Sequence, residues 1–362
     1  MLNVFQSWID RYFADEEAVL LALILSIGVL VVVTMGQVLA PMIASVIIAF
    51  LMQGMVSRLR VWGAPHILAV SIAFLVLVGC LAASLLLLLP AISRQAVTFF
   101  TELPRMLTEG RELLVLLPEK YPTLFSDQNV LQMVDSAGKS LGAMGQTILT
   151  FSLANLGVLA AALIYLVLVP ILVFFFLKDS NLIMTWLAAF LPKKRPVMNR
   201  IWHEMNQQIA NYVRGKVIEI IVVASASYVC FVCLGLNYAL LLALAVGLSV
   251  LIPYIGAAVV TFPVALIALF QWGWGTEFFY LLGAYAVIQA LDGNVLVPLL
   301  FSEAVNLHPV AIILAVLAFG GLWGFWGVFF AIPLATLVKA VLYAWPTLDI
   351  DVADQTEEIA AL

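Results

Sequence analysis

The chain has 362 residues, of which 65% are hydrophobic and 10% charged, and its mean hydropathy is +1.14. Soluble domains are about 45–50% apolar and about 25% charged, so this composition excludes a water-soluble globule. The formal net charge of −5 leaves no basic excess, and nucleic acid is therefore not an expected partner. The composition predicts an all-α polytopic integral membrane protein.

Stretches without Asp, Glu, Lys or Arg mark the parts expected to lie in the lipid bilayer: 18–57, 61–93, 140–177, 220–276 and 304–338. Residues 278–302 contain a single charge, that of Asp292. Because a span needs roughly 20 apolar residues, these stretches predict about eight transmembrane helices, with one or more broken or re-entrant. The first stretch holds two spans that meet near Gly36 and Pro41.

The alternation of polar and apolar segments divides the chain into seven expected regions. In order they are an interfacial N-terminal helix (1–17), spans one to three (18–93), an extracytoplasmic amphipathic helical region (94–149), span four (150–178), a cytoplasmic amphipathic helix region (179–215), spans five to eight (216–346) and an acidic cytoplasmic tail (347–362).

The placement of Lys and Arg predicts the orientation. With the N-terminus inside, eleven of the sixteen basic residues fall on the cytoplasmic side, and the other five lie between residues 94 and 139. Cytoplasmic loops carry an excess of Lys and Arg, so both termini are expected in the cytoplasm. Because no signal-peptide pattern opens the chain, we expect no cleaved leader.

Both polar regions contain helical stripes. Val97, Phe100, Leu103 and Leu107 recur at helical spacing in the extracytoplasmic region. In the cytoplasmic region one helical face is apolar, formed by Ile201, Met205, Ile209 and Tyr212. We expect that face to lie on the membrane surface or against a neighbouring subunit.

Motifs for the common enzyme chemistries are missing. The chain has no GxxxxGK[ST] loop, no HExxH and no GxSxG elbow. Its three histidines, His66, His203 and His308, are far apart in sequence, so no metal site is recognisable. We therefore expect no enzyme activity, no cofactor and no metal, which leaves a channel or a secondary transporter.

Asp292 is the first candidate for function, with Gln289 and Asn294 close by in the sequence. On a helix Asp292 lies about 22 Å from Glu277, deep in a bilayer. A carboxylate there is costly unless it is paired, hydrated or protonated. It either serves as a proton, cation or solute site or packs against a neighbouring helix through a hydrogen bond. Pro298 loosens the helix that follows.

Glu219 is the second candidate, and Lys216 precedes it by three residues. This spacing suits a local ion pair on one helix as well as a functional carboxylate. The third candidate is the sequence VLIPYIG at 250–256, where Pro253, Tyr254 and Gly256 interrupt an apolar segment. Transporters build sites from such discontinuous helices, although a proline kink is the simpler alternative.

The C-terminal stretch FGGLWGFWG at 319–327 contains Gly320 and Gly321, which favour either a broken helix or close helix packing. The run 304–338 therefore predicts one long, broken element or a tight hairpin. PVALIALF at 263–270 also resembles PVAIILAVL at 309–317, which would suit a duplicated hairpin.

Three segments resemble the autoinducer-2 exporter family: NYVRGKVIEIIV at 211–222, LIPYIGAAVVTFPVALIAL at 251–269, and the run from QALDGNVLVP to ATLVKAV at 289–341. The resemblance implies a homo-oligomeric bacterial inner-membrane protein of about eight spans that exports autoinducer-2, with some members associated with Na⁺(Li⁺)/H⁺ exchange. The matching positions are Pro253, Tyr254, Gly256, Asp292, Asn294, Pro298, His308 and Pro309. The family more usually has Glu where this chain has Asp292.

These observations give one leading hypothesis, a secondary permease that exports a small polar solute. The expected binding residues for the solute, a proton or a monovalent cation are Asp292, Asn294, Gln289, Glu219 and Tyr254. The expected structural breaks are Pro253, Gly256, Pro298, Pro309, Gly320 and Gly321. The alternatives are a Na⁺/H⁺ antiporter that uses Asp292 and Glu219, and a non-transporting scaffold that binds partners through residues 94–139 and 178–219.

Overall fold

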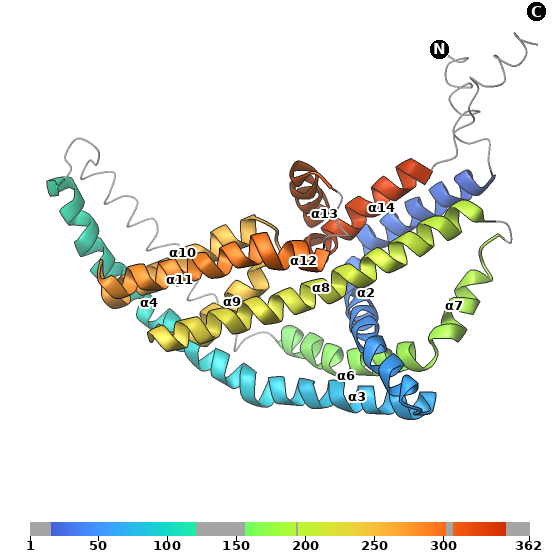
Figure 1. Ribbon diagram of the computed structural model, residues 1–362, viewed down its shortest axis with the longest axis horizontal. Helices are drawn as coiled ribbons and strands as arrows, with labels where there is room; N and C mark the ends of the chain where they lie inside the picture. The colour runs from blue at the N-terminus through green and yellow to red at the C-terminus, as the bar shows by residue number, and fades with distance from the viewer. Residues whose placement is uncertain (1–15, 121–155, 193–194, 302–306, 345–362) are drawn as a thin grey trace, which may run out of the picture. The chain divides into compact units, whose positions relative to one another are not determined.

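The computed structural model describes residues 16–120, 156–192, 195–301 and 307–344, and over these ranges it contains helices and turns but no strand (Figure 1). Within them, seven helices are long and apolar enough to cross a membrane, or eight if the bent pair α6–α7 is counted as one span. The predicted all-α polytopic fold with about eight spans is therefore confirmed. The expected interfacial helix and acidic tail lie almost wholly outside the described residues.

The chain divides into two compact units. The first contains Met1–Leu51, Phe175–Arg214 and Phe301–Leu362, and the second contains Met52–Phe174 and Gly215–Leu300. α8 (Pro196–Leu234) contributes its first half to one unit and its second half to the other.

The first unit contains most of α2 (Glu16–Val61), which is one helix with Pro41 inside it. α2 carries two apolar windows, Val19–Gly36 and Val38–Val61, where the sequence predicted two spans. This unit also contains α7 (Ser180–Ala188), α13 (Pro309–Phe329) and α14 (Ala331–Ala344).

The apolar face of the first half of α8 is covered by the chain itself. Ile201 and Met205 are buried with Leu21 of α2 and Ala340 of α14. The Tyr212 hydroxyl donates to the Phe329 carbonyl at 2.8 Å. The expectation that this face meets the membrane surface or another subunit was therefore wrong, because helices distant in the sequence bury it.

α13 reverses direction at Gly324, whose φ of 60° and ψ of −135° suit glycine. Beyond it, Gly327 packs directly on the Phe319 carbonyl and Gly320 on the Val328 side chain. A straight helix would hold residues 319 and 327 about 12 Å apart. The predicted broken element or hairpin is thus a tight reversal.

Pro309 and Gly321 are not breaks. Pro309 opens α13 at its first turn, where a missing N–H costs nothing, and the His308 ring accepts from the Val310 amide at 3.2 Å. Gly321 has open space around its Cα.

In the second unit, α3 (His66–Ala83), a π-helical turn η1 (Ser84–Leu88) and α4 (Leu89–Lys120) follow one another without interruption. α4 covers residues 94–120 of the segment expected to be an extracytoplasmic amphipathic region. α6 (Leu156–Lys178) packs on α3 through an edge contact of Phe74 with Phe174.

α9 (Ala239–Ser249) and α10 (Ile255–Trp272) form a hairpin. At its open end, Gln271 accepts from the Asn237 amide at 2.8 Å and donates to the Gly235 carbonyl at 2.7 Å. These bonds hold the beginning of α9 beside the end of α10, so the chain returns to the side from which it entered. PYIG is therefore the tip of a helical hairpin rather than a kink within one continuous helix.

The hairpin also separates the two similar sequences at 263–270 and 309–317. The first lies in the returning arm, α10, and the second in the opening arm of α13. Because the two segments occupy different arms, the structure gives no support to a duplicated hairpin.

The tip is held in a tight, strained shape. Tyr254 has φ 62° and ψ −47°, a backbone conformation that residues other than glycine rarely adopt. A methyl group at Gly256 would overlap the Ser249 carbonyl. Glycine at 256 is therefore required for the two arms to meet.

Gly256→Ala is expected to lower the stability of the protein by about 1–3 kcal/mol, because its methyl group would push the two arms apart. Thermal unfolding in detergent would measure the loss. Gly283→Ala is the matched control, since Gly283 lies in α11 (Thr276–Leu291) with open space around it. Equal stability of the two variants would contradict the close packing at the tip.

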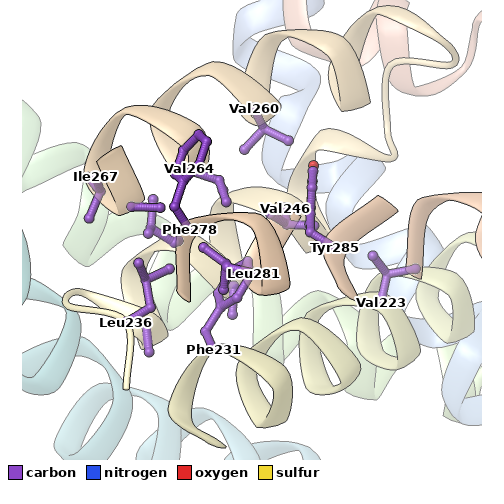
Figure 2. Packing of buried hydrophobic residues seen from close by; sticks show 14 of the residues in the cluster. Val223, Phe231, Leu236, Val246, Val260, Val264, Ile267, Phe278, Leu281 and Tyr285 are labelled. Carbon is purple, nitrogen blue, oxygen red and sulfur yellow. The ribbon is translucent and has the colours of Figure 1, made fainter. Parts of the chain in front are cut away.

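The core of this unit lies between the hairpin and its neighbours. Figure 2 shows the side chains of Phe231 from α8, Val246 from α9, Val264 from α10 and Leu281 from α11 converging. α11 runs antiparallel to α10, and Thr261 and Tyr285 share a hydroxyl hydrogen bond at 3.2 Å. The core fixes the register of all four helices.

α4 is attached to the open end of the hairpin. The Tyr238 hydroxyl donates to Glu102 at 2.7 Å, and Gln95 accepts from the Leu241 amide at 2.9 Å. Phe99 packs edge-on against the Tyr238 ring. Residues 95–102 and 235–241 therefore lie at the same end of this unit.

Burial, together with the hydrogen bond to Glu102 and its charge, raises the pKa of Tyr238 from 10 to about 12. The bond should therefore contribute fully below pH 10 and be lost as the pH rises through about 12. The difference in phenolate absorbance between the wild type and Tyr238→Phe isolates this titration. Glu102→Gln should lower the pKa of Tyr238 only part of the way towards 10, because burial remains; an unchanged titration would exclude Glu102 as a contributor.

Candidate functional site

The functional candidates centre on a buried ion pair in α8. The Lys216 ammonium lies 2.8 Å from Oε2 of Glu219, and the two residues are 4% and 2% exposed. The predicted local pair is therefore present, but it is almost fully enclosed. Charges removed from water in this way need close partners to persist.

Lys216 also contacts the hairpin tip. Its ammonium donates to the backbone carbonyl of Val250 at 2.8 Å. Val250 directly follows α9, where the end of a helix leaves carbonyls without an intrahelical donor. One lysine thus joins the ion pair of α8 to the tip of α9–α10.

Asp292 lies at the same level as the tip. It opens a π-helical turn, η2 (Asp292–Leu296), that continues α11 into α12 (Val297–Phe301). The Thr261–Tyr285 bond sets the register of α10 against α11. Asp292 is two turns beyond Tyr285 on one helix, and Tyr254 is two turns before Thr261 on the other. This register places Asp292 level with the PYIG break along the helix axis.

The three charged groups influence one another. The carboxylate of Asp292 interacts electrostatically with Glu219, and the ammonium of Lys216 interacts with Asp292. Two carboxylates facing one ammonium leave a formal charge of −1 when all three are ionised. Such a cluster can accept one proton or one monovalent cation.

Asp292 and Gln289 offer unused hydrogen-bonding groups. Among the described residues, Oδ1 of Asp292 and Nε2 of Gln289 are buried and have no hydrogen-bond partner. They lie three residues apart, on one face of α11. An acceptor beside a donor suits a polar ligand such as a hydroxyl group.

The other sequence-predicted residues serve the local structure rather than this cluster. The Asn294 side chain donates to the Ala290 carbonyl at 2.8 Å and is exposed, so it serves the local helix backbone. Tyr254 is 62% exposed, and its backbone rather than its ring shapes the tip. Pro298 follows the π-helical turn, which accommodates its missing N–H.

Sequence reasoning missed the bond between Lys216 and the Val250 carbonyl. Lys216 was counted among the cytoplasmic anchors, although its ammonium is buried. Its spacing from Glu219 was the available signal. Val250 takes part through a backbone carbonyl, which no side-chain pattern reveals. In the described part of the chain, no group of three or more His, Cys, Asp and Glu residues could hold a metal ion.

Comparison with known sequences decides the family. The sequence profile described as "AI-2E family transporter" matches residues 19–347. The chain belongs to the AI-2E transporter family.

Relatives in the AI-2E family cover nearly the same length. "Putative permease PerM" of Escherichia coli (strain K12) is 47% identical over 346 residues, 96% of this chain and 98% of PerM. "Putative transport protein YueF" of Bacillus subtilis (strain 168) is 26% identical over 83% of this chain and 82% of its own length. "AI-2 transport protein TqsA" of Escherichia coli (strain K12) is 23% identical over 89% of this chain and 92% of TqsA. The chain is a multi-span membrane protein of a bacterial permease family, which confirms the resemblance.

Proposed function

We propose that the protein is a secondary permease that exports a small polar solute, with autoinducer-2 as the first solute to test. The observation that carries this proposal is the pair of unpartnered groups on Asp292 and Gln289 beside the buried Lys216–Glu219 pair. A hydroxylated solute can donate to the carboxylate and accept from the amide. The relative named "AI-2 transport protein TqsA" supports this choice of solute.

Asp292 and Glu219 carry the proton or cation that drives transport in this proposal. Their combined charge exceeds that of Lys216, so binding one proton or cation neutralises the cluster. A neutral cluster is less costly in the low-dielectric interior of a membrane protein. Transport is thereby coupled to an ion gradient.

A Na⁺/H⁺ antiporter is the second candidate, favoured by the two carboxylates. Oxygen ligands such as carboxylates and backbone carbonyls suit hard cations. In this alternative the polar groups near Asp292 bind the ion itself, and no organic solute is moved.

We also propose that the protein is a homo-oligomer of the bacterial inner membrane with both termini cytoplasmic. The excess of Lys and Arg in the assigned cytoplasmic segments supports the orientation. The contact of α4 with the turn before α9 supports it further, because the topology requires residues 94–139 and 235–237 on one side.

The proposed function is tested in proteoliposomes that contain the purified protein. We expect autoinducer-2 flux that rises when a pH gradient is applied. Autoinducer-2 flux that does not depend on the pH gradient would contradict the proposed coupling of transport to an ion gradient. If no autoinducer-2 moves but added Na⁺ changes the internal pH, the antiporter replaces the permease. If neither autoinducer-2 flux nor a Na⁺-induced change of internal pH is observed, the result would favour the non-transporting scaffold.

A further inference from the structure

The hairpin α9–α10 carries no charge of its own. Residues 239–272 contain no Asp, Glu, Lys, Arg, His or Cys, and their single tyrosine, Tyr254, is exposed. A change of charge in the cluster therefore needs a group outside the hairpin to act on it. Lys216 is such a group, because it bonds the tip carbonyl of Val250 and the carboxylate of Glu219.

The contacts of Lys216 with Val250 and with Glu219 differ in kind. Glu219 is on the same helix, so that pair keeps its geometry when α9 and α10 move. The bond to Val250 joins two elements and is lost if the tip moves away from α8. A lysine has three donors on a flexible stem, so one ammonium can serve both partners.

The charged groups that surround the ammonium come from two elements. Glu219 lies beside the ammonium on α8, and Asp292, at the end of α11, interacts with it electrostatically. Arg214, two residues before Lys216 on α8, is exposed. When both carboxylates are ionised, the buried ammonium is well compensated. When they are neutral, it becomes a buried cation without a counter-charge, which is strongly unfavourable.

We propose that Lys216 is a positioning residue that couples the charge of Glu219 and Asp292 to the hairpin tip. With the carboxylates ionised, Lys216 pins the tip to α8 through Val250. When one carboxylate is neutralised, Lys216 still has a counter-charge; when a second proton or cation neutralises the other carboxylate as well, the ammonium turns towards water and releases the tip. This inference rests on the proposed function, since it says how ion binding reaches a moving part of the permease.

The strained tip fits this role. A backbone such as that of Tyr254 persists only where its surroundings enforce it, and the Lys216–Val250 bond is one such constraint. Its loss should let the tip relax. The Gln271 bonds at the far end of the hairpin would keep the two arms paired meanwhile.

The test measures how often the tip opens. Leu251, beside Val250, is 7% exposed, so a cysteine there reacts with a maleimide only when the tip leaves its site. The three native cysteines, Cys80, Cys230 and Cys233, are first replaced by Ser. Each labelling rate of Leu251→Cys is divided by that of the unfolded chain at the same pH, which removes the effect of thiol ionisation.

The informative variant is Lys216→Met combined with Glu219→Met, which removes both members of the buried ion pair together. We expect its labelling rate to rise about tenfold or more, the effect of losing one charge-assisted hydrogen bond. Lys216→Arg keeps the charge and should label more slowly than the double variant. Arg214→Met, which removes an exposed charge from the same helix, should label at the wild-type rate.

With Lys216 and Glu219 intact, the labelling rate of Leu251→Cys relative to the unfolded chain should rise as the pH falls. The double variant should lose this pH dependence. A double variant that labels at the wild-type rate would overturn the proposal, as would a wild-type rate that does not change with pH. No solute is present in this experiment. Its failure is therefore distinct from the failure of the permease, which is judged by flux alone.

Discussion

Lys216→Met alone is expected to destabilise the protein by about 3–5 kcal/mol, the range found when one member of a buried ion pair is removed. The substitution leaves Glu219, which is 2% exposed, without its counter-ion. It also takes the donor from the Val250 carbonyl. Thermal unfolding in detergent micelles would measure the loss.

The double variant with Met at both positions provides the control for this stability prediction. Replacing a buried pair by apolar side chains of similar size is often neutral or even stabilising, because neither charge must leave water. The double variant should therefore recover most of the stability that Lys216→Met loses. If the double variant is as unstable as the single one, packing rather than the unpaired charge accounts for the effect.

Asp292→Asn is expected to reduce gradient-dependent flux by about tenfold or more, a factor that corresponds to about 1.4 kcal/mol. Asparagine keeps the size of the side chain but cannot ionise, so the cluster loses a site for the proton or cation. Gln289 would still offer its amide, so solute binding should weaken less than coupling. Flux into proteoliposomes with and without a pH gradient separates the two effects.

Glu277→Gln is the matched control for Asp292→Asn. Glu277 is an exposed acid in the first turn of the same helix, about 22 Å from Asp292. Its neutralisation should leave the flux and its pH dependence unchanged. Wild-type flux with wild-type pH dependence in Asp292→Asn would remove the carboxylate from the mechanism. Asp292→Glu should retain part of the coupled flux, since it keeps the charge.

The fold class could be predicted because lipid imposes a strong constraint: apolar segments of about 20 residues must be helical in a membrane. The hairpin could not be predicted from the sequence. A kinked helix and a helical hairpin have the same apolar composition over residues 239–272, and the deciding bonds of Gln271 join residues 34 and 36 positions apart. The apolar pattern did not distinguish these two folds, whereas the rare charged residues did indicate the candidate site.

The candidate site was predicted in part for a related reason. Rare charges in apolar sequence stand out, so Glu219 and Asp292 were identified, and the spacing of Lys216 indicated its partner. Asn294 was included because a polar residue in such a segment attracts attention, but its amide satisfies the Ala290 carbonyl. Whether a polar side chain serves its own helix or a ligand depends on rotamer and local backbone shape, which the sequence does not specify.

The shortness of α9 has a consequence for biosynthesis. Its 11 residues measure about 16 Å, roughly half the hydrocarbon thickness of a bilayer. α9 is therefore too short to cross the bilayer alone, so the insertion machinery should retain it until α10 is available as the second arm of the hairpin.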